Sequence, residues 1–194
     1  MIRHGKTPMN LERRYIGKTD ESLAEEGRLQ IKELWSERPE AEIVFASPMK
    51  RCIETAKMIF SDMDPDRFIR IPEWKEMDFG LFEGKNFAEL NGNPIYQKWI
   101  DSGGTDNFPD GEGMAGFKAR VAHGFEQFIK ICGPLTENST VKAAAVVHGG
   151  TIMAVMSMLT GGDYYDFMCK HGTGYRIELS PDGKLIKEPE KLFA

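Results

Sequence analysis

Short apolar runs alternate with longer amphipathic segments along most of the chain. Residues 42–46 and 141–147 are apolar runs bounded by polar residues, and each has the length of a buried strand. Residues 68–71 form a third such run, and the chain opens on a fourth at Met1–Ile2. Strands that alternate with helices are typical of an α/β domain. The pattern predicts a three-layer α/β/α sandwich around a mostly parallel sheet.

Apolar residues between these runs recur at helical spacing. A helix is expected after Ser47-Pro48, with Pro48 in its first turn, where the missing N–H costs nothing. A longer helix is expected over residues 114–132 because its apolar positions repeat every three or four residues. Those positions are Phe117, Val121, Phe125, Phe128 and Cys132. Two further helices are expected, one opened by Ser22–Gly27 and running to about Ser36, and one over residues 151–159.

The remaining segments read as loops and short elements. Residues 7–20 are polar and predict a loop, and residues 87–102 predict short helices broken around Gly92-Asn93-Pro94. Residues 103–113 are rich in Gly, Asp, Asn and Pro and predict a loop. The alternating stretch Tyr175–Leu179, followed by a Pro-Asp-Gly turn, predicts a C-terminal antiparallel hairpin. We therefore expect one domain, residues 1–194, in which residues 85–113 form a lid or insert.

The composition limits the classes of function. Apolar residues make up 41% of the chain and charged residues 28%, as in ordinary globular domains. A net charge of −5 argues against nucleic acid or an anionic membrane as a partner. The three cysteines are scattered without metal-ligand spacing, which favours free thiols in a reducing compartment. The sequence has neither a secretory leader nor an apolar run of transmembrane length, so the cytoplasm is the expected location.

Two of the expected strands end in a histidine followed by glycine. The first run leads into Arg3-His4-Gly5, and residues 141–147 lead into His148-Gly149-Gly150. Ligands of open α/β sheets lie outside the carboxyl ends of strands, so both histidines stand where a ligand would bind. Taken alone, each motif is equally consistent with ordinary residues at a strand end. Only Met1 and Ile2 precede the first motif, so we expect a short first strand, truncated or continued upstream.

An arginine and a group of carboxylates complete the candidate chemistry. Arg51 falls in the first turn of the helix after Pro48, where the helix dipole disfavours a cation unless an anion is bound. A solvated helix residue is the alternative reading. Residues 73–84 place several carboxyl groups among apolar neighbours. These groups are Glu73, Glu76, Asp78 and Glu83.

The four stretches Arg3-His4-Gly5, Ser47–Arg51, Glu73–Gly84 and His148–Thr151 together resemble, in content and order, the histidine phosphatase superfamily, also called the phosphoglycerate mutase-like family. The resemblance covers most of the chain and implies the phosphoglycerate mutase-like fold. It implies that His4 is a nucleophile that becomes phosphorylated, and that Glu76 protonates the leaving group and later activates water. It also implies that a set of side chains and one backbone N–H bind the phosphate. This set is Arg3, Asn10, Arg51, His148 and Gly149.

Elementary chemistry agrees with these roles. A histidine attacks phosphorus only as neutral imidazole, and nearby arginines favour that form while they hold the phosphate through charge-assisted hydrogen bonds. Apolar neighbours and the bound phosphate raise the pKa of a carboxyl group, so Glu76 can remain protonated. Glu73, Asp78 and Glu83 are rivals for this role. The histidines are expected far apart and without ligand spacing, so we expect a metal-independent enzyme with no cofactor. They are His4, His123, His148 and His171, the last expected to be structural or at the substrate edge.

Three functions remain open on the sequence alone. They are a phosphomonoester phosphatase, a phosphoglycerate mutase-type phosphotransferase and a non-catalytic phosphate-binding module. The spelling of Glu76–Gly84 and of Pro109–Gly113 resembles the branch that holds α-ribazole-5′-phosphate phosphatases and broad-specificity relatives, which favours hydrolysis of a sugar- or nucleoside-like phosphate. Four loop aromatics would form a surface for a flat base, or core: Tyr15, Phe79, Phe82 and Phe108. The expected partner is a small phosphomonoester, and the expected state is a monomer or homodimer.

Overall fold

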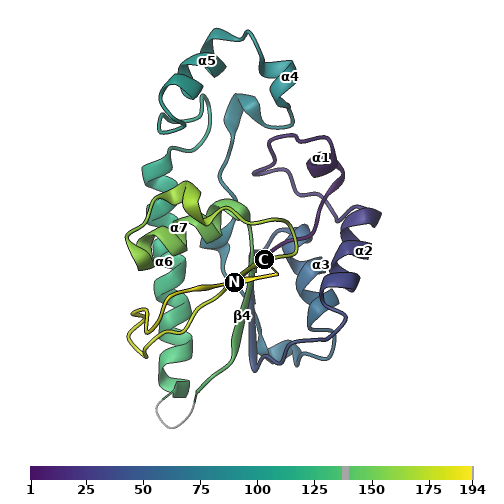
Figure 1. Cartoon of the computed structure of the whole chain (residues 1–194), viewed down its shortest axis with the longest axis vertical. Helices are drawn as coiled ribbons and strands as arrows, with labels where there is room; N and C mark the ends of the chain where they lie inside the picture. The colour runs from purple at the N-terminus through teal and green to yellow at the C-terminus, as the bar shows by residue number, and fades with distance from the viewer. Residues whose placement is uncertain (137–139, 194) are drawn as a thin grey trace.

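The computed structural model describes residues 1–136 and 140–193 and shows a central sheet with helices on both faces (Figure 1). Within these residues the sheet has the strand order β3-β2-β4-β1-β5-β6. Its strands are β1 (Ile2–Arg3), β2 (Ile43–Ala46), β3 (Phe68–Arg70), β4 (Ala143–Val147), β5 (Gly174–Arg176) and β6 (Glu190–Leu192). Strands β1 to β4 pair in parallel, whereas β5 and β6 pair antiparallel. The predicted sandwich, with its mostly parallel sheet and C-terminal antiparallel pair, is confirmed.

Successive strand residues face opposite layers, as the pleat requires. Val44 and Val146 pack toward the layer of α2 (Glu25–Leu34) and α3 (Lys50–Ile59). Phe45 and Val147 pack toward the layer of α6 (Met114–Cys132) and α7 (Gly149–Thr160). These four side chains are fully buried. The continuous apolar runs seen in the sequence therefore arise because both faces of the central strands are covered.

The helix bounds agree with the sequence in the interiors and differ at the ends. Helix α6 spans the predicted residues, whereas α2 ends at Leu34 rather than Ser36. Helix α3 begins at Lys50 with Met49 as its N-cap, so the expectation that Pro48 lies in the first turn is wrong. Helix α7 begins at Gly149, two residues before the predicted start, and His148 is its N-cap. The consequence is that both glycines of this motif belong to a helix terminus.

The loop predicted over residues 7–20 contains a short helix, α1 (Pro8–Leu11). Thr7 is its N-cap and forms a capping box with Asn10. Pro8 at the first helical position supports the same turn. The expectation of an irregular loop was therefore wrong at these residues, and the Thr-Pro-x-Asn spacing was the signal for the helix.

Two short helices, α4 (Phe87–Leu90) and α5 (Pro94–Asp101), project at one end of the molecule (top of Figure 1). The chain breaks between them where the sequence predicted, and residues 103–113 then lead to α6. An aromatic cluster fastens them to the body, with the hydroxyls of Tyr15 and Tyr96 2.9 Å apart. The role of residues 85–113 as a lid remains a prediction. The 3-10 turns are Pro65–Arg67, Pro72–Trp74, Gly80–Phe82, Gly133–Thr136 and Tyr164–Phe167.

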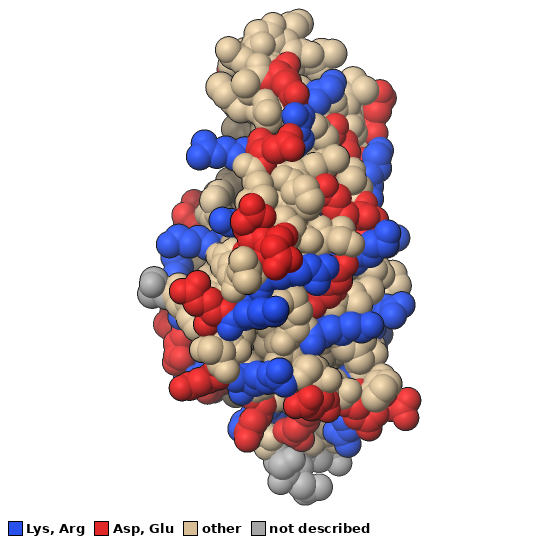
Figure 2. All heavy atoms as spheres, turned by 90° about the vertical axis from the view of Figure 1, so that its right-hand side faces the viewer, with Lys and Arg blue, Asp and Glu red and all other residues tan. Residues whose placement is uncertain are grey.

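The surface on the side of α2 and α3 mixes both signs of charge. Figure 2 shows Lys and Arg side chains interspersed with Asp and Glu over this face. Of the helices in the described part of the chain, none combines the length and the apolar character needed to cross a bilayer. On the face shown in Figure 2, the cations lie beside carboxylates and form no uniformly positive surface.

Candidate active site

The sheet order brings three sequence motifs to one edge. His4 follows β1, Ser47 follows β2 and His148 follows β4, and these strands are neighbours in the order β2-β4-β1. The N–H of His4 donates to the carbonyl of Val147 at 3.0 Å, and the N–H of Ser47 donates to that of Val146 at 3.0 Å. These backbone bonds extend the ladder to the motifs themselves. The side chains after the three strands are therefore fixed relative to one another by the sheet.

His4 is a buried neutral imidazole with a defined tautomer. Its Nδ1 lies 2.7 Å from the carbonyl oxygen of Gly5. A carbonyl only accepts, so Nδ1 carries the proton and Nε2 keeps its lone pair. Burial lowers the pKa of His4 well below its ordinary value, and the charges of His148 and Arg51 lower it further. This is the protonation state that attack on phosphorus requires.

His148 takes the opposite tautomer. The Nε–H of Arg51 donates to its Nδ1 at 3.3 Å, so the ring proton lies on Nε2 and is donated to Ser47 Oγ at 2.7 Å. Burial lowers the pKa of His148 well below its ordinary value, and Arg51 adds to the effect. His148 therefore has a donor at the strand ends, which a phosphate oxygen would receive in exchange for Ser47. Its contact with phosphate remains a prediction.

Three of the four histidines meet, contrary to the expectation that they lie far apart. The ring centroids of His4 and His148 are 5.2 Å apart, and those of His4 and His171 are 5.4 Å apart. The late loop reaches this position because the N–H of Gly172 donates to the carbonyl of Arg3 at 3.0 Å. Burial lowers the pKa of His171 to about 3. His123, on α6, remains apart with an exposed side chain.

The three adjacent rings do not form a metal site. Among residues 1–136 and 140–193, no three His, Cys, Asp or Glu side chains are grouped to hold an ion. Cys52 and Cys132 are buried and Cys169 is half-buried, and all three are free thiols.

Two arginines approach the histidines in different ways. Arg51 is fully buried, and its Nη1 and Nη2 donate to the carbonyls of Thr19 at 2.7 Å and Gly17 at 2.9 Å. With the bond to His148, three of its five N–H groups have partners among the described residues, and two are left for a ligand. Arg3 donates through Nη1 to the carbonyl of Cys169 at 2.7 Å.

Arg3 also carries an unsatisfied donor. Within the described residues its Nε is buried and has no hydrogen-bond partner. A buried charged donor without a partner is costly, and a bound anion would satisfy it. The predicted anion site thus has one donor that the protein alone leaves unused.

The predicted contacts of Asn10 and Gly149 with phosphate remain predictions. The side-chain oxygen of Asn10 accepts from the N–H and from the hydroxyl of Thr7, each at 3.1 Å. Its amide NH₂ group is the part that would reach a phosphate. Gly149 is the first residue of α7. Its N–H therefore has no partner within the helix, because the first N–H groups of a helix lack a preceding carbonyl to bind. Gly149 lines the cavity described below.

Glu76 is the carboxyl group that the fold buries at the site. Its Oε1 accepts from the N–H of Met77 at 3.0 Å, and its Oε2 accepts from the N–H of Gly150 at 3.2 Å. Burial raises the pKa of Glu76, although these two N–H groups and the two arginines oppose the shift. A carboxyl group with a raised pKa next to an anion site is suited to general acid catalysis.

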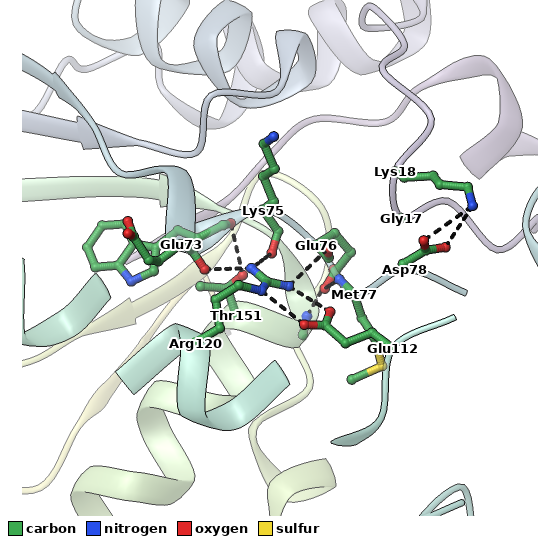
Figure 3. A network of polar contacts seen from close by, with 12 residues as sticks. Gly17, Lys18, Glu73, Lys75, Glu76, Met77, Asp78, Glu112, Arg120 and Thr151 are labelled. Carbon is green, nitrogen blue, oxygen red and sulfur yellow. Dashed lines mark hydrogen bonds and ion pairs between the residues drawn. The ribbon is translucent and has the colours of Figure 1, made fainter. Parts of the chain in front are cut away.

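Two of the rival carboxylates, Glu83 and Asp78, accept hydrogen bonds from the backbone, and Figure 3 shows the pair that Asp78 forms with Lys18. Oε1 of Glu83 accepts from the N–H groups of Gly17 at 2.8 Å and Thr19 at 2.9 Å. Asp78 forms an ion pair with Lys18 at 3.2 Å and accepts from the N–H of Gly80 at 2.9 Å. Glu73 lies 3.8 Å from the exposed His123, and its buried Oε2 has no hydrogen-bond partner among the described residues. Of the four carboxyl groups, Glu76 lines the cavity described below together with Arg3, and this position favours it over Glu73, Asp78 and Glu83.

A cavity of about 240 Å³ opens beside Arg3 and Glu76. Its walls are otherwise aromatic and apolar: Tyr15, Met77, Phe79, Trp99, Phe108, Met114, Gly149, Gly150, Met153, Tyr164, Tyr165 and Met168. Three of the aromatics proposed from sequence line it, whereas Phe82 is 1% exposed and belongs to the core. Trp99, Tyr164 and Tyr165 come from distant segments and were missed, because no local pattern marks a residue that faces a cavity. Among the described residues of the wall, Arg3 and Glu76 are the charged ones.

Comparison with known proteins agrees with this geometry. The family model described as "Histidine phosphatase superfamily (branch 1)" matches residues 1–189. The chain belongs to the histidine phosphatase superfamily.

Relatives within the superfamily have different activities in their names. The chain is 27% identical over 165 residues to a Hydrogenobacter thermophilus protein named provisionally as a phosphoserine phosphatase, covering 83% of this chain and 77% of that protein. It is 32% identical over 167 residues to a 2,3-bisphosphoglycerate-dependent phosphoglycerate mutase of Gloeobacter violaceus, covering 82% and 74%. The crystal structure of the α-ribazole phosphatase from Shigella flexneri superposes with a TM-score of 0.78 at 24% identity, covering 100% and 94%. The last comparison confirms the fold.

Proposed function

We propose that this superfamily member is a metal-independent phosphomonoester hydrolase that acts through a phosphohistidine at His4. The observation that carries the proposal is the state of His4, a buried neutral ring with its proton on Nδ1 and its lone pair on Nε2. The adjacent Arg3 supports the proposal, because its buried Nε has no hydrogen-bond partner among the described residues and would be satisfied by an anion held beside His4.

The reaction follows in two balanced steps. Nε2 of His4 forms a bond to phosphorus while the ester oxygen leaves, and protonated Glu76 gives its proton to that oxygen. Glu76, now a carboxylate, then takes a proton from water, whose oxygen attacks the phosphohistidine. The P–N bond breaks, phosphate departs, and His4 and Glu76 regain their starting states. Arg3 and Arg51 stabilise the charge on the phosphoryl oxygens, where each well-aimed donor is worth about 3 kcal/mol.

The cavity supports an uncharged, flat leaving group. A carboxylate, as in 3-phosphoglycerate or phosphoserine, would enter an aromatic cavity whose described wall offers it no opposite charge beyond Arg3, which the phosphate itself would use. An aromatic base would bury apolar surface against Phe79 and its neighbours. We therefore favour a sugar- or nucleoside-like 5′-phosphate. α-Ribazole-5′-phosphate is the leading single candidate, supported by the name of the Shigella flexneri neighbour.

The phosphohistidine is tested by quenching the enzyme during turnover and mapping the label. Acid-labile, base-stable phosphate on His4 is the expected result, and His4→Ala should lose essentially all activity. Chelators should leave the rate unchanged, and vanadate should inhibit by imitating pentacoordinate phosphorus. Label on another residue, or a strict requirement for magnesium, would contradict the mechanism.

The substrate class is tested by comparing kcat/KM over a panel of phosphomonoesters. The panel holds α-ribazole-5′-phosphate, a nucleoside 5′-phosphate, phosphoserine, glycerol phosphate and 3-phosphoglycerate. Highest values for the two nucleoside-like esters are expected. Mutase activity on 3-phosphoglycerate that exceeds hydrolysis of every member would favour the phosphotransferase alternative. A flat profile would identify a generalist, and no turnover of any member would favour a binding module.

A further inference from the structure

Residues 73–76, which carry the Glu76 side chain, are held by side chains rather than by a regular element after the 3-10 turn Pro72–Trp74. Arg120 donates from α6 to the carbonyls of Glu73 at 2.6 Å, Lys75 at 2.9 Å and Glu76 at 3.5 Å (Figure 3). The hydroxyl of Thr151, on α7, donates to the carbonyl of Trp74 at 3.3 Å. Four successive carbonyls are thus fixed by two helices.

Arg120 is itself fixed by Glu112. Its Nε donates to Oε1 of Glu112 at 3.0 Å, and its Nη2 donates to Oε2 at 2.7 Å. With the three carbonyls, the five N–H groups of the guanidinium meet five acceptors. This forked pairing restrains the plane of the arginine, and both side chains are less than a third exposed. Lysine, with a rotatable ammonium group, cannot reproduce the pattern.

The helix that carries Arg120 is also close to the segment. A Cβ atom at Gly124, one turn later on α6, would lie 2.7 Å from the indole of Trp74. The glycine lets α6 approach residues 73–76, so that Arg120 reaches their carbonyls. We call Arg120, Glu112 and the carbonyls that Arg120 binds in residues 73–76 the clamp. The clamp therefore depends on close helix packing as well as on charge.

Glu112 joins the clamp to the wall of the cavity. Its N–H donates to the carbonyl of Asp78 at 2.9 Å, and its carbonyl accepts from the N–H of Phe108 at 3.3 Å. Phe108 lines the cavity that receives the leaving group in the proposed function. Glu112 is therefore bonded both to Phe108 in the cavity wall and to Arg120, which holds the segment that carries Glu76.

We infer that Arg120, held by Glu112, is a positioning residue that fixes the Glu76 carboxyl for proton transfer to the leaving oxygen. The inference rests on the proposed role of Glu76 as the acid. Arg120 acts through the backbone of residues 73–76, since among the described residues neither it nor Glu112 forms a hydrogen bond or ion pair with the Glu76 carboxyl. Its loss should leave the phosphate site intact and displace the acid.

The test compares an alkyl phosphate with p-nitrophenyl phosphate, whose leaving group needs no proton. For Arg120→Met we expect kcat on the alkyl ester to fall about 10-fold to 100-fold, since a displacement of about 1 Å can cost this much. For the aryl ester we expect a change of less than about 3-fold, with KM nearly constant for both. Arg120→Lys and Glu112→Gln should shift the alkyl-to-aryl ratio in the same direction by smaller factors.

Arg28→Met is the matched control, because Arg28 forms a comparable pair with Glu54 that joins α2 to α3. It should lower the melting temperature and leave the alkyl-to-aryl ratio unchanged. If Arg120→Met does not fold, Arg120→Lys and Glu112→Gln decide the question. Equal losses on both esters in the folded variants would overturn the inference.

Glu76→Gln separates this inference from the proposed function. If Glu76→Gln slows the alkyl ester selectively and the Arg120 and Glu112 variants do not, Glu76 remains the acid and the clamp has only a structural role. If Glu76→Gln itself slows both esters equally, the proposed acid is wrong, and the inference fails with it.

Discussion

Gly150 and Glu76 lie so close that a Cβ atom at position 150 would stand 2.4 Å from Oε1 of Glu76. The N–H of Gly150 donates to Oε2 of the same carboxyl group at 3.2 Å. The backbone of Gly150 therefore binds the Glu76 carboxyl, and its missing side chain leaves the space in which that carboxyl lies. This explains the second glycine of His148-Gly149-Gly150 without any special backbone angle.

Gly150→Ala should displace the Glu76 carboxyl, because the new methyl group and Oε1 cannot share the space. We expect kcat on an alkyl phosphate to fall at least about 10-fold, with a smaller effect on an aryl phosphate. Steady-state kinetics on the two esters checks this.

Gly116→Ala is the control for that substitution. Gly116 also lies early in a helix, and a Cβ atom there would meet nothing within 4 Å. The change should leave kcat unaltered and stabilise the protein by about 0.5 to 1 kcal/mol, as alanine does in helices. A Gly150→Ala enzyme with wild-type kinetics on both esters would show that Glu76 is free to move or is not the acid.

Much of the fold was readable from sequence because local patterns determine it. The apolar stripe of residues 114–132 predicted both ends of α6 correctly. The apolar runs at 42–46 and 141–147 predicted β2 and β4, which begin one and two residues later than expected. His4 and His148 were placed correctly at strand ends because the carboxyl ends of parallel strands meet at one edge. Helix ends were less certain, since the caps Met49 and His148 bind no backbone group through their side chains in the described structure.

The sequence predicted site residues only where they belong to a local motif. The contact of His171 with His4 joins residues far apart in sequence, and the pattern around His171 carries no sign of it. No sequence pattern predicts the ion pair between Glu112 and Arg120 either, although the two residues lie only eight positions apart. Such contacts follow from the packing of loops onto the sheet, which a one-dimensional pattern does not contain.

Stability should fall as the pH drops below about 6.5. The pKa of His171 is lowered by burial to about 3, and those of His4 and His148 are lowered well below their ordinary values. Below about 6.5 the unfolded chain binds protons that the folded protein does not, which destabilises the fold by up to about 1.4 kcal/mol per pH unit for each histidine. The raised pKa of Glu76 acts oppositely, adding stability that is lost as the pH rises. Because each group changes the slope by at most one proton, three histidines give a net slope opposite to that of one carboxyl group.

Urea unfolding at about pH 7 and about pH 5 measures this effect. His171→Asn removes one of the three groups and should make the pH dependence shallower. His123→Asn, at an exposed position on α6, should leave the dependence unchanged. A wild-type protein equally stable at both pH values would contradict the lowered pKa values of these histidines in the folded state.

Arg51→Met should weaken both the fold and catalysis. It leaves the buried carbonyl of Gly17, the half-buried carbonyl of Thr19 and Nδ1 of His148 without their donor. The expected loss is about 2 to 4 kcal/mol of unfolding free energy, from unsatisfied buried acceptors. Because His4 remains, a slow phosphorylation of His4 should persist, in contrast to His4→Ala. Urea unfolding and trapping of the labelled enzyme measure the two effects, and a variant as stable as wild type would mean that other donors replace Arg51.

The aromatic wall of the cavity should determine specificity through KM and kcat/KM rather than through the chemistry at phosphorus. Phe79 lies in this wall, with its ring centroid 5.3 Å from Tyr15 and 5.0 Å from Phe108. Removal of one aromatic contact with a base costs about 1 to 3 kcal/mol, so Phe79→Ala should lower kcat/KM for a nucleoside 5′-phosphate by at least about 5-fold.

A small ester separates this loss from damage to the catalytic groups. Ethyl phosphate has no ring to stack on Phe79, so its kcat/KM should change by less than about 2-fold in Phe79→Ala. Phe87→Ala is the matched control, because Phe87 is 64% exposed on α4 and is not part of the cavity wall. It should leave both esters unaffected. If Phe79→Ala slows both esters to the same extent, the aromatic wall supports the fold of the site and does not select the leaving group.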